Sequence, residues 1–147
     1  MNTVKRALAQ KNSDLISISS GDMVVEALHR MRDHRVRAVL VIDSNELVGI
    51  VTLGDCAIKV LLPGLDAEQT PVGEVMTSDP VTVKLDDLLE YCLSIMAVRG
   101  HRHLPVLDTG EVVGMISIGD AVKHIIKDLE LNVSDLMGYM MADGPGG

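Results

Sequence analysis

Residues 49–55 and 114–120 of this chain are two versions of one seven-residue segment, and this duplication constrains the fold more than any other feature. Asp120 lies 65 positions after Asp55, and the same displacement aligns the sequence with itself without a gap. Identical pairs extend far from the segment, among them Asp22 with Asp87 and Met31 with Met96. Two units are too few for a solenoid, which needs at least about three. The sequence therefore predicts two similar halves that face each other in one body.

The order of apolar runs and turn residues is the same in both halves. Strands are predicted at 15–18, 38–42 and 47–51 and at 81–83, 104–107 and 112–117, with helices at 23–33, 54–62, 87–98 and 120–129. The fold class is α/β (α+β), a tandem pair of β-α-β-β-α units related by pseudo-twofold symmetry. We expect an N-terminal helix in 1–13, repeat 1 in 14–62, a linker and short turn in 63–78 and repeat 2 in 79–129. Residues 133–137 echo the turn at 72–76, so in 130–147 we expect a helix and turn packed back on the body, with a loose tail from Met140.

Composition and charge exclude several classes of protein. The 147 residues are 47% hydrophobic, but the longest apolar runs are the length of strands, well below the roughly 18 residues of a membrane span. The net charge is −8 and the chain has no Trp or Phe and only two Tyr, which disfavours nucleic-acid binding. We expect a cytoplasmic protein that binds neither membrane nor nucleic acid.

Reactive side chains do not form a catalytic or metal-binding pattern. Cys56 aligns with Ala121, and Cys92 with Ala27, so both cysteines are predicted to be small core residues. The pair His101 and His103 does not have a usual zinc spacing. We expect no metal, no required cofactor and no enzymatic activity.

The duplicated segment resembles a family signature. A β-α-β-β-α unit whose last strand ends in Gly-h-h-[Thr/Ser]-x-x-Asp, with h an apolar residue, resembles the cystathionine β-synthase (CBS) domain pair. The resemblance covers 14–62 and 79–127 and includes the segments 76–77, 80–83 and 103–108. It implies a regulatory module that binds AMP, ADP, ATP or NAD(H) in clefts between its halves, and that often dimerises into a flat disc.

Carried onto this chain, the resemblance implies two nucleotide sites. The repeat 2 site would comprise Thr82, Val83, His103, Leu104, Pro105, Ser117 and Asp120, and the repeat 1 site Ser17, Ile18, Ala38, Val39, Thr52 and Asp55. Pro105 has no counterpart in the first half, so the second half is expected to be the more typical site. Without Phe or Trp, a base would lie between aliphatic side chains, with candidates Ile18, Val39, Ile50, Val83, Leu104 and Met115.

The residue types themselves fit this chemistry. A hydroxyl at Thr52 or Ser117 can donate to phosphate, and a carboxylate at Asp55 or Asp120 can accept from two ribose hydroxyls. The alternative is that these residues only cap helices. Basic residues precede both central strands and are candidates for phosphate binding, namely Arg35, Arg37, Arg99, His101 and Arg102. The alternative for them is solvated loop charge.

Three functions remain open from the sequence. The first is a nucleotide sensor that acts in trans on an unknown protein partner. The second is a constitutive dimerisation or scaffold module, and the third is a binder of another adenosyl ligand such as S-adenosylmethionine. A homodimer is expected, through the helices near 23–31 and 88–96, which carry more apolar residues than one buried face needs.

Overall fold

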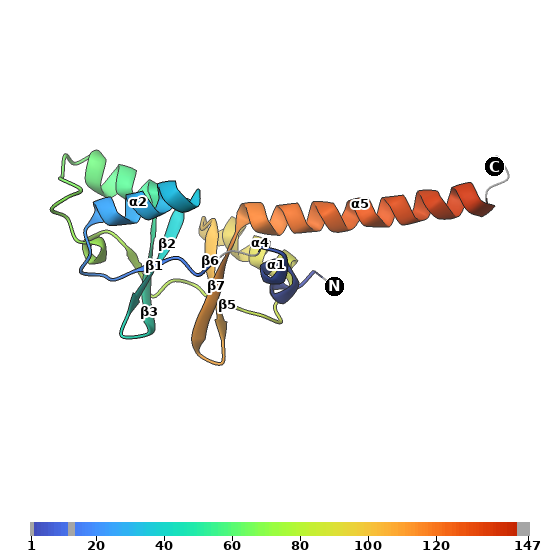
Figure 1. The fold of residues 1–147 in the computed structure, drawn as a ribbon, viewed down its shortest axis with the longest axis horizontal. Helices are drawn as coiled ribbons and strands as arrows, with labels where there is room; N and C mark the ends of the chain where they lie inside the picture. Colours follow the sequence, from blue (N-terminus) through green and yellow to red (C-terminus); the bar gives the residue numbers. More distant parts are fainter. Residues whose placement is uncertain (1, 12–13, 144–147) are drawn as a thin grey trace.

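The computed structural model describes residues 2–11 and 14–143 and consists of two similar halves side by side (Figure 1). The first half contains β1 (Ser17–Ile18), α2 (Val24–His34), β2 (Ala38–Asp43), β3 (Glu46–Thr52) and α3 (Leu53–Cys56), which continues as the π-helix η1 (Ala57–Leu61). The second half contains β5 (Val83–Lys84), α4 (Leu89–Arg99), β6 (His103–Asp108), β7 (Glu111–Ser117) and α5 (Ile118–Asp143). The predicted duplicated β-α-β-β-α order is confirmed.

The two sheets repeat each other down to their irregularities. In each half the first strand pairs in parallel with the second, and the second and third strands form an antiparallel hairpin. A register shift falls between Val41 and Ile42 in one hairpin and between Val106 and Leu107 in the other. The central turn residues have positive φ in both hairpins, as tight two-residue turns require (Ser44, Asn45, Thr109 and Gly110).

The segments that precede the repeats are exchanged between the halves. Helix α1 (Val4–Lys11) precedes the first repeat but packs into the core of the second, where Val4 and Ala7 are buried. The 3-10 turn η2 (Val72–Glu74) precedes the second repeat but contributes Val72 to the core of the first. The short strand β4 (Thr77–Ser78) then adds to the outer edge of β3. Each half is therefore completed by chain that leads into the other half.

The C-terminal segment differs from the prediction. Helix α5 is continuous over 26 residues, so residues 133–137 are helical and do not form a turn, and the helix extends beyond the body (Figure 1). In the first half the corresponding helix meets Pro63 and Gly64, which end helices. The aligned positions of the second half hold Asp128 and Leu129, which allow the helix to continue. The predicted loose tail from Met140 is helical as far as Asp143, and its last four residues lie outside the described residues.

Both cysteines lie in the two hydrophobic cores, as predicted. Cys56 and Cys92 are buried and unpaired. Burial raises the pKa of both thiols, to about 11 for Cys92, which keeps them protonated and unreactive. None of the helices in 2–11 and 14–143 combines the length and apolarity needed to cross a bilayer.

The first glycine of each signature segment makes room for an exchanged segment. A Cβ placed on Gly49 would lie 2.8 Å from the carbonyl oxygen of Thr77 and 2.5 Å from Sδ of Met76. A Cβ placed on Gly114 would lie 3.0 Å from Cδ2 of Leu8, at the end of a flexible side chain. Only in the first half is the neighbour a backbone atom held in a sheet.

We predict that Gly49→Ala lowers the free energy of unfolding by about 1–3 kcal/mol, because β4 must move to accept the methyl group. Gly114→Ala is the matched control and should cost clearly less, because Leu8 can change rotamer. Urea denaturation of both variants measures the difference. Equal losses would show that the close approach of β4 is not the reason for Gly49.

Candidate functional site

The Thr/Ser-x-x-Asp part of each signature forms a reciprocal cap at the start of a helix. The backbone N–H of Asp55 donates to Oγ1 of Thr52 at 3.1 Å, and the backbone N–H of Thr52 donates to Oδ2 of Asp55 at 2.9 Å. Ser117 and Asp120 make the same two hydrogen bonds, each at 3.0 Å. Both pairs therefore cap helices, and their predicted role in ligand binding stays a prediction. Capping leaves room for a ligand, because a carboxylate can accept about four hydrogen bonds.

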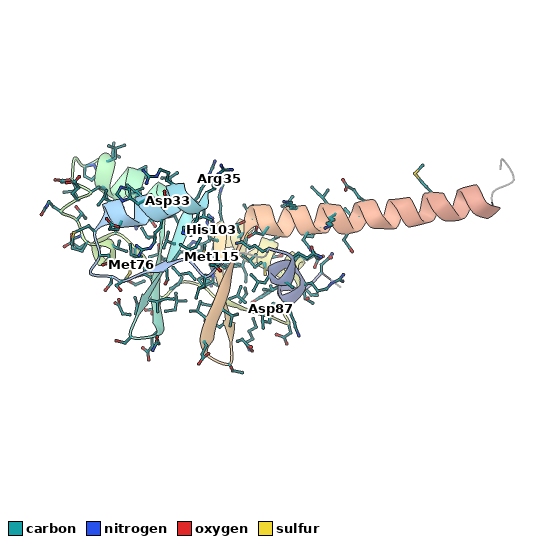
Figure 2. All side chains as sticks on the ribbon, viewed as in Figure 1. Asp33, Arg35, Met76, Asp87, His103 and Met115 are labelled. Atoms are coloured by element: carbon teal, nitrogen blue, oxygen red, sulfur yellow. The ribbon has the colours of Figure 1, made fainter. Side chains whose placement is uncertain are left out.

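One cavity combines the first of these caps with basic residues of the other half. It has a volume of about 580 Å³ and holds Thr52 and Asp55 on one side and Gly100–His103 on the other. Arg37, Ile50 and Thr77 also belong to its lining, with Leu53, Gly54 and Ala57. Figure 2 places His103 at the boundary between the two halves. The site is thus built across the halves, as a cleft ligand requires.

The backbone fixes the basic side of this cavity. The carbonyl of Arg37 accepts from the N–H of Leu53 at 2.9 Å, which ties the arginine to the start of α3. Gly100 ends α4 with φ of 72° and turns the chain toward the cavity. Of the predicted phosphate-binding residues, Arg37, His101 and Arg102 line the cavity, whereas Arg35 and Arg99 do not. Arg35 and Arg99 instead lie at the C-terminal ends of α2 and α4.

His103 adds a titratable group to the same wall. Burial lowers the pKa of His103 below its ordinary value of 6.5, and the positive charge of Lys11 lowers it further, while Asp120 acts in the opposite direction. The imidazole is therefore held neutral near pH 7 in the protein without ligand. A bound anion beside it would favour the protonated form.

The second signature is engaged by a lysine from outside its half. Nζ of Lys11 lies 2.8 Å from Oδ2 of Asp120 and donates to the carbonyl of Met115 at 3.0 Å. Burial would raise the pKa of Asp120, but the hydrogen bonds from Lys11 and Ser117 outweigh it and hold the pKa below 3.8. The cavity that Lys11 and Met115 line has a volume of only about 90 Å³. Neither Ser117 nor Asp120 belongs to the lining of that cavity, whereas Thr52 and Asp55 line the cavity of about 580 Å³. That the second half is the more typical site stays a prediction.

The remaining predicted residues are distributed between the cores and a different cavity. Ile18, Ala38, Val39, Val83, Leu104 and Pro105 are all buried. Ile50 is the base-contact candidate that lines the cavity of about 580 Å³. Ser17 pairs with Leu40 in the first sheet.

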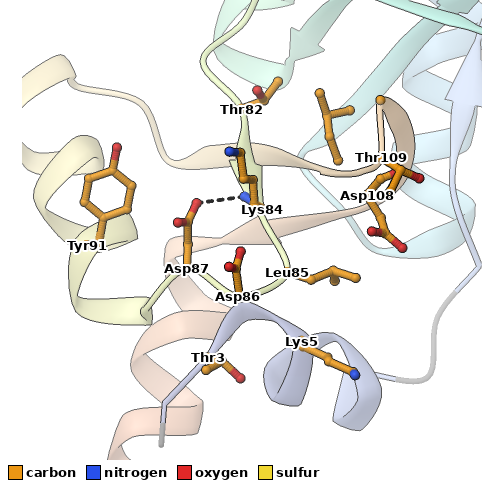
Figure 3. Close-up of a pocket in the computed structure, with 12 residues that line it drawn as sticks. Thr3, Lys5, Thr82, Lys84, Leu85, Asp86, Asp87, Tyr91, Asp108 and Thr109 are labelled. Carbon is orange, nitrogen blue, oxygen red and sulfur yellow. Dashed lines mark hydrogen bonds between the residues drawn. The ribbon is translucent and has the colours of Figure 1, made fainter.

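Thr82 belongs to a separate cavity at the hairpin end of the second half (Figure 3). This cavity has a volume of about 980 Å³ and includes Lys84, whose N–H donates to Asp87 at 2.8 Å. The structure does not bring Thr82 together with Ser117 and Asp120 in one cavity. In the part of the chain that the structure describes, no cluster of three or more His, Cys, Asp or Glu could hold a metal ion.

Sequence reasoning did not name Lys11 as a site residue, nor the cavity residues Leu53, Gly54, Ala57, Thr77 and Gly100. Thr77 belongs to the segment 76–77, and Gly100 directly precedes His101, so both could have been found from residues already singled out. Lys11 had no such signal, because its aligned partner is Met76, an apolar residue.

A duplicated β-α-β-β-α fold with a capped carboxylate after each third strand defines a tandem pair of small α+β domains. The family model of the CBS domain matches the chain twice, over residues 6–61 and 72–127. The chain belongs to the CBS domain family, whose paired domains form regulatory, ligand-binding modules.

Proteins of similar and of greater length have related sequences. The chain is 32% identical over 120 residues to the CBS domain-containing protein YhcV of Bacillus subtilis, which covers 82% of this chain and 83% of that protein. It is 38% identical over 132 residues to the CBS domain-containing protein CBSCBSPB5 of Arabidopsis thaliana, which covers 89% of this chain and 24% of that protein. The chain thus spans about a quarter of the length of the plant relatives.

Solved structures share the fold. A crystal structure of the CBS domain NE2398 superposes with a TM-score of 0.80 at 38% identity and covers 84% of this chain and 97% of that one. Two more distant structures contain ligands. They are a CBS domain protein of Pyrobaculum aerophilum complexed with AMP, at 22% identity and a TM-score of 0.72, and the CBS domain pair of MJ0100 with 5′-methylthioadenosine and S-adenosylmethionine, at 24% and 0.75. At these identities they show a common fold.

We predict that the free energy of unfolding falls as the pH is lowered from about 7.5 to 5.5. His103→Gln should remove the contribution of His103 to this pH dependence. The pKa of His103 is lower in the folded protein, so the unfolded chain binds more protons in this range. The contribution of neutral His103 to stability is therefore complete above pH 6.5 and is lost as the pH falls through the pKa of the folded protein. Urea denaturation at several pH values measures it, and an unchanged slope in the variant would contradict the assignment.

Proposed function

We propose that the protein is a regulatory module that binds an adenine nucleotide in the cavity between Asp55 and His103 and signals in trans to a protein partner. The observation that carries the proposal is the composition of this cavity. A hydroxyl and a carboxylate from the first half face basic side chains from both halves, in a protein of net charge −8. This pattern suits a ligand with a ribose at one end and phosphate at the other.

Each part of a nucleotide has a partner of suitable chemistry in this cavity. Asp55 can accept from ribose hydroxyls while it keeps its hydrogen bond from Thr52. Arg37 and Arg102 are exposed at the cavity, so they can contact phosphate without first losing much hydration energy. Ile50 and Leu53 offer aliphatic surface to a base. The role is regulatory rather than catalytic, and it requires no other cofactor.

AMP, ADP, ATP and NAD(H) share the groups that this cavity fits. The AMP complex of the Pyrobaculum aerophilum protein supports such a ligand for the fold. S-adenosylmethionine, bound by the MJ0100 pair, is the alternative adenosyl ligand. It has no phosphate, and its sulfonium would be repelled by the arginines, so we favour a nucleotide.

Coupling to a partner requires that the ligand prefers one arrangement of the two halves. The cavity provides this preference, because Asp55 and Arg37 come from the first half and Arg102 comes from the second. A phosphate that contacts Arg37 and Arg102 together would draw the halves toward each other.

We also propose a homodimer, which would equally serve the alternative scaffold function. Exposed large apolar side chains gather on the last helices of each half: Leu53, Ile58, Leu61 and Leu62 on α3, η1 and the residue after it, and Ile118, Val122, Ile126 and Leu129 on α5. Helix α4 of the predicted interface also exposes Tyr91 and Val98, with Leu88 directly before it. Two such stripes exceed what a monomer usually exposes. A monomeric mass in light scattering would contradict the dimer.

We predict that Asp55→Asn lowers the affinity for AMP by about 10- to 100-fold, the value of one or two hydrogen bonds to a charged group. Isothermal titration calorimetry measures the affinity. The matched control is Asp120→Asn, which changes the same signature position in the other half, lies outside the lining of this cavity and should cost clearly less affinity. A larger loss in Asp120→Asn would move the site to the second half.

We predict that adenosine binds at least about tenfold more weakly than AMP, because it lacks the charge-assisted phosphate contacts. Arg102→Gln should reduce this preference, whereas Arg99→Gln, three residues earlier and outside the cavity, should not. Titration of both ligands into the three proteins gives the comparison. If adenosine equals AMP, the basic residues are solvated surface and the proposed function fails.

A further inference from the structure

Gln10 and Lys11, the last two residues of α1, contact the second signature and the helix that follows it. Lys11 bridges Oδ2 of Asp120 at 2.8 Å and the carbonyl of Met115 at 3.0 Å. Oε1 of Gln10, the preceding residue, lies 2.9 Å from Nδ1 of His124, which is buried one turn further along α5. Lys11 and Asp120 are both largely shielded, with side-chain exposures of 24% and 26%. This is a defined contact rather than a surface ion pair.

The first half differs at the aligned position. The residue that lies 65 positions after Lys11 is Met76, which carries no charge. Asp55 does have a lysine partner, because Nζ of Lys59 lies 3.2 Å from its Oδ1 and also donates to the carbonyl of Val75 at 3.0 Å. That lysine belongs to the same helical segment as Asp55, whereas Lys11 comes from outside the second repeat. Lys59 is not part of the lining of the 580 Å³ cavity, which Asp55 does line. Lys11 lines a cavity of about 90 Å³ between the halves, and Asp120 is not part of that lining.

Helix α1 cannot readily withdraw this lysine. Val4 is fully buried and Ala7 is nearly so, and both belong to the core of the second half. The N–H of Val4 also donates to the carbonyl of Asp87 at 2.9 Å. The ammonium group is thus held at Asp120 by the same packing that completes the fold.

We propose that Lys11 occupies the carboxylate of the second half in place of a ribose, so that each chain binds one nucleotide and not two. This inference rests on the proposed function of the first cavity. A ribose at Oδ2 of Asp120 would have to displace Lys11 from that oxygen and from the carbonyl of Met115. The carboxylate would then lose its ion pair and keep only the backbone hydrogen bond from Ser117 beside the ribose hydroxyls. The duplication thus supplies two signatures, and one residue outside them makes the sites unequal.

Lys11→Met tests the proposal, because it gives the second half the residue that the first half has at this position. Calorimetric titration with AMP should give one site per chain in the wild type and a second, weaker site in the variant. Lys11→Arg retains the charge and should keep one site. Lys59→Met removes a lysine from the other signature and should also keep one site.

The double variant Lys11→Met/Asp120→Asn locates the new site, because it should return to one nucleotide per chain. Circular dichroism confirms that each variant is folded, and Lys11→Gln replaces Lys11→Met if the latter is not. Two sites in the wild type, or one site in folded Lys11→Met or Lys11→Gln, overturn the inference and leave the proposed function intact. No AMP binding by the wild type or by any variant overturns the proposed function itself.

Discussion

The exchange of leading segments between the halves is the contact on which the structure depends. Helix α1 fills the core of the second half, and η2 with β4 completes the first, so neither half can bury its core without chain that belongs to the other side. The halves are therefore held in one arrangement by apolar packing rather than by the linker alone. The cavity between Thr52 and His103 exists because of that arrangement, since its two walls come from different repeats.

The repeat made most of the fold predictable, because a fixed displacement compares each residue with one that has the same local role. Asn45 and Gly110 revealed both hairpin turns in this way, and Cys56 and Cys92 were placed in the core by their small partners. The displacement carries no information on which half a segment packs against, so the exchange of α1 and η2 could not be predicted. The likeness of 133–137 to 72–76 predicts a turn, and this prediction is wrong because no Pro-Gly pair follows Lys127 to end the helix, as Pro63 and Gly64 do in the first half.

For the site, sequence reasoning identified residue types but not their grouping. Thr52 and Asp55 were found from the motif, and Arg37 and His101 from their places before the central strands. Arg35 was not separable from Arg37 by type or position. In the structure Arg35 ends α2 in the left-handed region with φ of 56°, where its aligned partner is Gly100. That geometry is unfavourable for a side chain with a Cβ, and nothing in the described contacts accounts for the arginine there.

The unbroken course of α5 has a mechanical consequence. The helix begins at the cap formed by Ser117 and Asp120 and runs for 26 residues, so at 1.5 Å per residue it is a rod of about 39 Å. Its first turns are clamped by the body, while the remainder projects away from it (Figure 1). A tilt of about 5° at the clamped end displaces the far end by about 3 Å over that length. A rearrangement too small to alter the sheets therefore produces a larger displacement at the projecting end of α5, far from the cleft.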